Sequence, residues 1–213
     1  MLIAIAHQKG GCSKTTIAIN LAVELKVTDC FDLDLAKGGT TGISFLSKLR
    51  EKAGHSNLNV VPVNNKSELT KIIESDSDDK LMIMDLGGLD SDVNRIALAY
   101  ADLVVTPASD SVLEIGGLAE FSRMLNQISN QTGHEIKAHV IAARTNYARK
   151  SWPSLEGVCG NHPNLVFSGV AMPLYVDFVD ASAEGQSVVE YNKKGRAAKH
   201  MLTVVEYIKS ILK

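Results

Sequence analysis

Short, uniformly apolar runs alternate along the chain with stretches whose apolar positions recur every three or four residues. Residues 1–6, MLIAIA, form the first such run, and residues 17–25, IAINLAVEL, follow it with helical spacing. The runs LMIMD at residues 81–85 and LVVTP at residues 103–107 are typical of parallel strands that are buried on both faces. The alternation predicts an α/β fold in which helices cover both faces of a doubly wound, mostly parallel sheet.

The other predicted elements continue this alternation. Pro62 cannot donate to a ladder, so the strand that contains it is expected at the edge of the sheet. Ser67 is expected to cap the helix that follows Asn64 and Asn65. Strands are expected at residues 28–35, 58–63, 136–143 and 165–170, and helices at residues 42–52, 67–74, 93–100, 114–131 and 195–213.

Length and composition narrow the class of protein. The 213 residues are enough for one sizeable α/β domain and too few for two, so a single domain over residues 1–213 is expected. Apolar residues make up 45% of the chain and charged residues 22%, which is typical of a soluble globular protein. The formal net charge of −2 gives no general attraction to DNA or to anionic membranes, so any such binding needs a local patch.

Cysteine usage and hydropathy predict a cytoplasmic protein. Cys12, Cys30 and Cys159 have neither metal-ligand spacing nor the even number of a disulfide framework. The sequence has no signal peptide and no apolar run of about eighteen residues, the length that a membrane span needs.

The stretch HQKGGCSKTT, residues 7–16, joins the first strand to the first helix and predicts a phosphate-binding loop. Main-chain N–H groups of such a turn point inward, and the positive end of the following helix faces the anion. Lys14 would place a charge on the β- and γ-phosphates, and Thr15 would offer a hydroxyl to Mg²⁺. The strict GxxxxGK[ST] pattern fails because Gln8 and Ser13 replace both outer glycines. The alternative is a chance Lys/Gly turn, which the flanking strand and helix disfavour.

With Lys9 at its head, the stretch resembles the deviant Walker A motif, KGGxxK[ST]T, of the ParA/MinD family of ATPases, which are P-loop NTPases. The resemblance implies ATP and Mg²⁺ as cofactors and a homodimer bridged by ATP, because Lys9 would reach the partner's ATP. Two triphosphates brought close would repel, and lysines supplied across the interface offset that repulsion. The residues expected around the phosphates are Lys9, Gly10, Gly11, Cys12, Ser13, Lys14, Thr15 and Thr16, with Cys12 a small filler rather than a redox switch.

Carboxylates end two of the predicted strands beside this loop, where they suit metal-bound water and the positioning of an attacking water. The segment DLDLAKGGTTGI, residues 32–43, resembles the family's DxDPQGNATSGL segment with departures at residues 35–37. The resemblance implies that Asp34 assists hydrolysis, together with Lys9 and Lys14 as catalytic residues, and that Asp32 lies on the Mg²⁺ side. A solvated turn with ordinary aspartates is the alternative.

Asp85 ends the apolar run LMIMD and resembles a Walker B aspartate, which holds Mg²⁺ through water. A strand-end aspartate that caps the next helix is the alternative, and the two roles are compatible. Thr15, Asp32 and Asp85 are therefore the expected metal-side residues.

The C-terminal segment 172–201 resembles the corresponding region of the family, where the loop after the proline packs on the nucleotide base. This implies base contacts from Met172 and Pro173, with Asp177 as a further candidate. In the family, the strand end at residues 144–146 also lies near the adenine.

Basic residues near the C-terminus form a candidate DNA-binding patch, since such a stripe can neutralise several phosphates. A solvated helix whose lysines serve solubility is the alternative. Small ParA proteins bind nonspecific DNA as ATP dimers, and a centromere-binding or adaptor protein stimulates their hydrolysis during plasmid or chromosome partition. The residues expected to contact DNA are Lys193, Lys194, Arg196 and Lys199.

The resemblance leaves other functions open. A positioning ATPase for a protein cargo, such as carboxysomes or chemoreceptor clusters, would have the same motifs. A MinD-like membrane-surface ATPase is disfavoured because the chain ends in a packed helix rather than a basic amphipathic tail, so no stable membrane anchor is expected. A metabolic enzyme of the same fold is disfavoured by Lys9. Because the first strand begins at residue 2, no N-terminal helix-turn-helix domain is expected. The resemblance implies a cytoplasmic location, with association with the nucleoid when ATP is bound.

Overall fold

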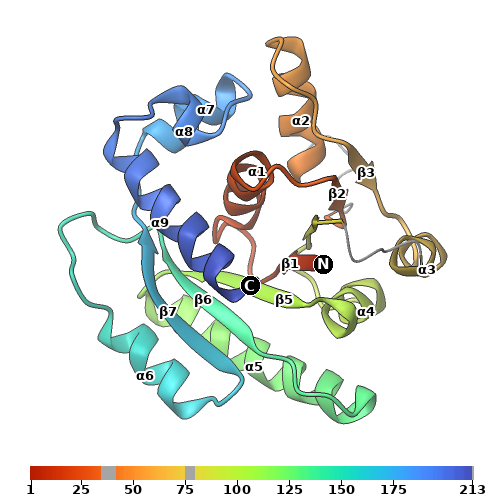
Figure 1. Cartoon of the computed structure of the whole chain (residues 1–213). Helices are drawn as coiled ribbons and strands as arrows, with labels where there is room; N and C mark the ends of the chain where they lie inside the picture. Colours follow the sequence, from red (N-terminus) through yellow and green to blue (C-terminus); the bar gives the residue numbers. More distant parts are fainter. Residues whose placement is uncertain (35–41, 75–79, 213) are drawn as a thin grey trace.

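The computed structural model describes residues 1–34, 42–74 and 80–212. Within these residues seven strands form one sheet in the order β3-β2-β4-β1-β5-β6-β7, and every neighbouring pair is parallel (Figure 1). The predicted doubly wound α/β fold is confirmed, and the sheet is parallel throughout. The strands are β1 (Leu2–Ile5), β2 (Asp29–Asp32), β3 (Val60–Pro62), β4 (Met82–Asp85), β5 (Leu103–Ala108), β6 (Ala138–Ala143) and β7 (Leu165–Met172).

Helices cover both faces of the sheet (Figure 1). One face is covered by α1 (Lys14–Glu24), α2 (Gly42–Lys52), α7 (Asp177–Ala183), α8 (Val188–Tyr191) and α9 (Arg196–Ile211). The other face is covered by α3 (Lys66–Glu74), α4 (Asp92–Tyr100), α5 (Val112–Thr132) and α6 (Pro153–Asn161).

The two apolar cores explain the uniformly apolar strands. In β4, the side chains of Met82 and Met84 lie in one core and that of Ile83 lies in the other. Successive side chains of a strand point to opposite faces, so a strand covered on both sides must be apolar at every position. Each fully buried side chain of this size contributes about 1.5–3 kcal/mol to stability.

Two predictions about the secondary structure need correction, and the first concerns the cap of a helix. The cap of α3 is Asn65, whose Oδ1 accepts the N–H of Glu68 at 3.0 Å, while the Glu68 carboxylate accepts the N–H of Asn64 at 2.7 Å. Ser67 lies inside the first turn, so its predicted role as the cap is wrong. Asn65 is the cap because it directly precedes the first helical residue and its side-chain oxygen reaches a free N–H of the first turn; its side-chain amide in turn donates to Glu68 at 2.8 Å.

The second correction concerns the segment after β7. The sequence patterns predicted no helix there, yet α7 and α8 occupy it. These patterns also predicted no helix at residues 153–161, where α6 lies. The predicted strand 28–35 ends at Asp32 in β2, and residues 35–41 lie outside the described residues.

The strand order fixes where a ligand can bind. β1 lies between β4 and β5, and its chain leaves through α1 toward β2 on the far side of β4. In open parallel sheets the crevice outside the carboxyl ends at such a switch point is the ligand site. β3 lies at the sheet edge, as Pro62 predicted. In the described part of the chain, no helix combines the length and the apolar character needed to cross a bilayer.

Candidate functional site

The loop between β1 and α1 has the backbone conformation of an anion-binding turn. Gly11 and Ser13 both have left-handed backbone angles, with φ of +75° and +79°. A left-handed serine costs about 1–2 kcal/mol relative to a right-handed one, and such strain is concentrated at functional sites. The replacement of the usual glycine by Ser13 has therefore left the turn intact, and α1 begins directly after it at Lys14.

Lys14 is buried within this loop, with 7% of its surface exposed. Its Nζ donates to the carbonyl oxygen of Lys9 at 2.9 Å and lies 4.0 Å from Sγ of Cys12. A buried ammonium needs hydrogen-bond partners, and here main-chain oxygen supplies one. Cys12 is itself buried and donates to the same carbonyl at 3.3 Å, and burial raises the pKa of its thiol. Cys12 thus packs inside the turn as a small residue.

Asp85 and Thr15 form a buried pair beside the loop. The Thr15 hydroxyl donates to Oδ2 of Asp85 at 2.6 Å, and Oδ1 of Asp85 is buried with no hydrogen-bond partner among the described residues. Burial raises the pKa of the Asp85 carboxyl to about 7. An orphaned carboxylate oxygen next to a threonine hydroxyl fits a Mg²⁺ site, because Mg²⁺ takes one or two carboxylates and completes its shell with water and phosphate oxygens.

A cluster of metal-ligating side chains is another feature that can mark a metal site. Among the described residues, no group of three or more His, Cys, Asp or Glu side chains could hold a metal ion.

Asp32 and Asp34 lie on the adjacent strand end. Asp32 is the register partner of Asp85 and is fully buried. Its Oδ1 accepts the N–H of Asp34 and its Oδ2 accepts the N–H of Ser44, each at 3.1 Å. Asp32 thus fastens the start of α2 to β2 and sets the position of Asp34. A Cβ placed on Gly87 would lie 3.0 Å from Oδ1 of Asp34, so a larger residue there would require this carboxylate to shift.

A cavity of about 500 Å³ extends from the loop toward α7. It brings together most of the predicted phosphate-side residues and the predicted base-side pair. Lys9, Cys12, Asp32, Asp85 and Asp177 lie outside its lining. The lining consists of Gly10, Gly11, Ser13, Lys14, Thr15, Thr16, Asp34, Arg144, Met172, Pro173, Leu174, Tyr175, Phe178, Val179 and Ser182.

Several lining residues were not predicted from the sequence as site residues. Arg144 has a left-handed backbone, with φ of +56°, and its guanidinium donates to the carbonyl oxygen of Gly11. Its Nη1 also lies 3.9 Å from a carboxylate oxygen of Glu114. The resemblance placed the strand end at residues 144–146 near the adenine, but a contact between Arg144 and the glycine-rich loop was not predicted. Tyr175 and Phe178 were missed because the turn and helix that carry them were not predicted.

Lys9 does not point into the cavity. Its ammonium donates to the main-chain carbonyl oxygen of Leu113, at the start of α5. The side chains of Val112 and Leu113 beside it are exposed by 87% and 74%. The lysine thus lies along α5 on an exposed, partly apolar surface.

The four predicted DNA contacts lie on the surface around the start of α9. Lys193 and Lys194 lie in the turn before this helix, and Lys199 is exposed on its first turns. Within the described residues, none of the four makes an ion pair. The guanidinium of Arg196 lies 5.9 Å from the ring centre of Tyr147, a cation–π arrangement.

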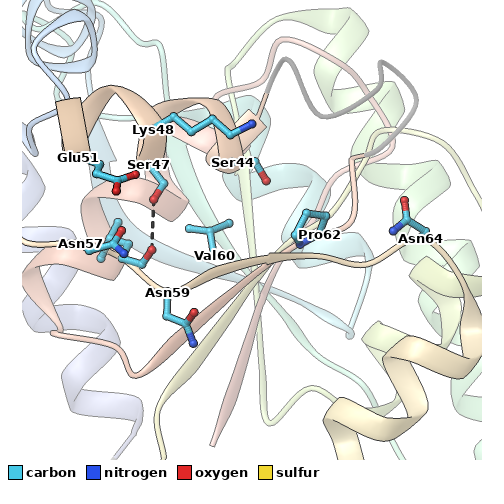
Figure 2. A pocket seen from close by; sticks show the side chains of 10 residues that line it. Ser44, Ser47, Lys48, Glu51, Asn57, Asn59, Val60, Pro62 and Asn64 are labelled. Atoms are coloured by element: carbon cyan, nitrogen blue, oxygen red, sulfur yellow. Dashed lines mark hydrogen bonds between the residues drawn. The ribbon is translucent and has the colours of Figure 1, made fainter.

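A second hollow of about 690 Å³ lies between α2 and β3, away from the loop (Figure 2). Ser44, Ser47, Lys48 and Glu51 face it from α2, and the opposite side is formed by the segment 57–64. One cation and one carboxylate cancel, and the glycine-rich turn is absent from this lining, so it lacks the chemistry that holds phosphate. None of the predicted site residues lines it.

The chain is similar to known ATPases. The family model described as ATPase MipZ matches residues 1–151. A comparison with curated protein sequences gives no match.

Three solved structures share the fold. The cell division ATPase MinD of Pyrococcus furiosus is 17% identical, with 99% of this chain and 98% of that chain covered and a TM-score of 0.70. Apo McdA from Cyanothece is 14% identical, with 100% and 99% covered and a TM-score of 0.74. A ParA family ATPase from Chlorobium tepidum is 16% identical, with 97% and 98% covered and a TM-score of 0.67.

Proposed function

This chain belongs to the MipZ family of ATPases, within the ParA/MinD group, and we propose that it hydrolyses ATP in a Mg²⁺-dependent cycle of dimerisation on DNA. In this proposal ATP bridges two copies of the chain, and the dimer binds DNA without sequence preference. A centromere-binding or adaptor protein stimulates an intrinsically weak hydrolysis, and the cycle drives plasmid or chromosome partition. The whole chain, residues 1–213, forms the ATPase domain.

The observation that carries the proposal is the composition of the main cavity. One end consists of the left-handed turn at Gly11 and Ser13 with the ammonium of Lys14, which suits a triphosphate. The other end consists of apolar and aromatic side chains, among them Pro173 and Phe178, which suit a flat base. The two ends match the two ends of a nucleotide.

The residues of the site divide the chemistry between them. Lys14 exchanges the Lys9 carbonyl for the β- and γ-phosphates, and Asp34 orients the attacking water. When bound, Mg²⁺ neutralises the charge that develops on the phosphates, with Thr15 and Asp85 as its protein-side groups.

Because Lys9 is proposed to act across the dimer interface, its replacement is expected to affect dimerisation and not nucleotide binding by the protomer. Lys9→Ala is expected to keep ADP binding by the protomer and to abolish ATP-dependent dimerisation, because the partner's triphosphate loses a neutralising cation. Light scattering with ATP, compared with ADP, measures the dimer. An undiminished ATP-dependent dimer in Lys9→Ala would contradict the ATP-bridged arrangement.

DNA binding is expected to depend on ATP and on salt. Each phosphate contact contributes about 0.9 to the slope of log affinity against log salt, so Lys194→Ala/Arg196→Ala is expected to reduce the slope by about 2. Gel retardation with ATP and with ADP across a salt series measures this. Lys209→Ala is the matched control, because that ammonium already pairs with Glu206 at 3.0 Å. Equal retardation of DNA with ADP and with ATP would contradict the ATP dependence. An equal fall of the salt slope in Lys209→Ala would exclude Lys194 and Arg196 as the DNA contacts.

A further inference from the structure

Both the main chain and the side-chain ammonium of Lys9 are fixed by hydrogen bonds. Its main-chain N–H donates to Nδ1 of His7 at 3.0 Å, and its ammonium donates to the carbonyl oxygen of Leu113. Its own carbonyl oxygen accepts from Lys14 at 2.9 Å. A long, flexible lysine side chain is thus fixed in one direction, although it loses considerable rotamer freedom.

His7 is a buried acceptor for this arrangement. Only 2% of its surface is exposed, and its ring stacks on Phe121 with centroids 6.2 Å apart and planes 14° apart. Because Nδ1 accepts the Lys9 N–H, the ring must be neutral with its proton on Nε2. Burial and the charges of Lys14 and Lys9 lower the pKa of His7 to about 4, which keeps the acceptor available.

Gly117 of α5 completes the arrangement from the other side. A Cβ placed on Gly117 would lie 3.0 Å from Cε1 of His7 and 3.2 Å from both Cδ and Cε of Lys9. A Cβ placed on the preceding Gly116 would have no atom within 4 Å. Of these two adjacent glycines, only Gly117 leaves room that the lysine and the histidine use.

We propose that His7 and Gly117 form a seat that aims Lys9 along α5 and so sets the affinity of ATP-dependent dimerisation. The inference rests on the proposed role of Lys9 and deepens it. His7 and Gly117 act through Lys9 and are positioning residues. On association the ammonium would exchange the Leu113 carbonyl for a second protomer's phosphates. Because the rest of the side chain is already ordered, little further entropy would be lost, which is the benefit of preorganisation.

The glycine pair gives a matched test. Gly117→Ala is expected to weaken ATP-dependent dimerisation by about tenfold, because the displaced lysine must be ordered again on association, while ADP affinity of the protomer is kept. Gly116→Ala, the same change one residue away, is expected to leave both unchanged. Light scattering over a protein concentration series and titration with a fluorescent ADP measure the two quantities. Equal dimerisation in the two variants would overturn the proposal.

Two further variants keep the test independent of folding defects. His7→Asn retains a side-chain acceptor and is expected to keep most of the dimerisation, whereas His7→Leu, which has no acceptor, is expected to lose it. In thermal denaturation, Gly117→Ala is expected to destabilise the Lys9→Ala background less than the natural chain, because Cδ and Cε of the lysine are gone. Equal destabilisation in both backgrounds would overturn the seat.

These outcomes separate the two levels of inference. If Lys9→Ala keeps the ATP-dependent dimer, the proposed function fails. If Lys9→Ala loses the dimer while Gly117→Ala and His7→Leu keep it, the function stands and the seat fails.

Discussion

Replacing Lys14 with alanine is expected to lower ATP hydrolysis by at least about 100-fold, the usual effect of removing one preorganised donor from a developing negative charge. Lys14 is buried, lines the end of the cavity that is proposed to hold the phosphates, and donates there to the carbonyl oxygen of Lys9. Phosphate release under saturating ATP and Mg²⁺ measures the rate, and titration with ADP measures the loss of affinity.

Lys48→Ala is the control for this experiment. Lys48 is an exposed lysine of α2 that lines the polar hollow of Figure 2 and lies outside the 500 Å³ cavity. Its replacement removes the same charge and is expected to leave hydrolysis unchanged. If both variants lost activity alike, or if Lys14→Ala kept its rate, the assignment of the phosphate site would be wrong.

Gly185→Ala is expected to lower the free energy of unfolding by about 3 kcal/mol, the sum of a left-handed alanine and an overpacked contact. Gly185 has φ of +67°, and a Cβ there would lie 2.4 Å from both the N and the Cα of Arg50. These are backbone atoms that cannot turn away. Thermal denaturation should show a fall in Tm of about 6–12 °C for a chain of this size.

Gly133→Ala separates the two causes of that loss. Gly133 also has a left-handed backbone, with φ of +78°, but a Cβ there would have no atom within 4 Å. This variant is expected to lose only the backbone part, about 1–2 kcal/mol. If the two variants were equally stable, the close contact between the α7–α8 turn and α2 would not matter.

The contact at Gly185 also joins α2 to the turn between α7 and α8. Arg50 is 1% exposed and donates to both carboxylate oxygens of Glu190, at 2.6 and 2.8 Å, and to the carbonyl oxygen of Gly185 at 3.1 Å. The guanidinium holds the pKa of the Glu190 carboxyl below its usual value. The C-terminal end of α2 is thereby fastened to the turn that follows α7 and to α8. Residues of α7 in turn line the apolar end of the cavity.

Periodicity was sufficient for most of the scaffold. The run LMIMD predicted a strand buried on both faces, and β4 has its side chains in two cores. The proline of residues 58–63 predicted an edge strand, and β3 lies at the edge. Periodicity failed at α7 and α8, because helices of seven and four residues are too short to show a helical repeat.

The sequence by itself determined the sheet, the phosphate-type turn and the carboxylates at the strand ends, because each depends on residues that are close in the chain. Strand patterning, turn chemistry and strand-end position are local properties. The tertiary structure alone decided that Arg144 would reach Gly11, that α7 would line the base end, and that Gly117 would leave room for Lys9. These contacts join residues more than about a hundred positions apart, and a glycine or an arginine has no local signal of its distant partner, since packing between elements decides which side chains meet.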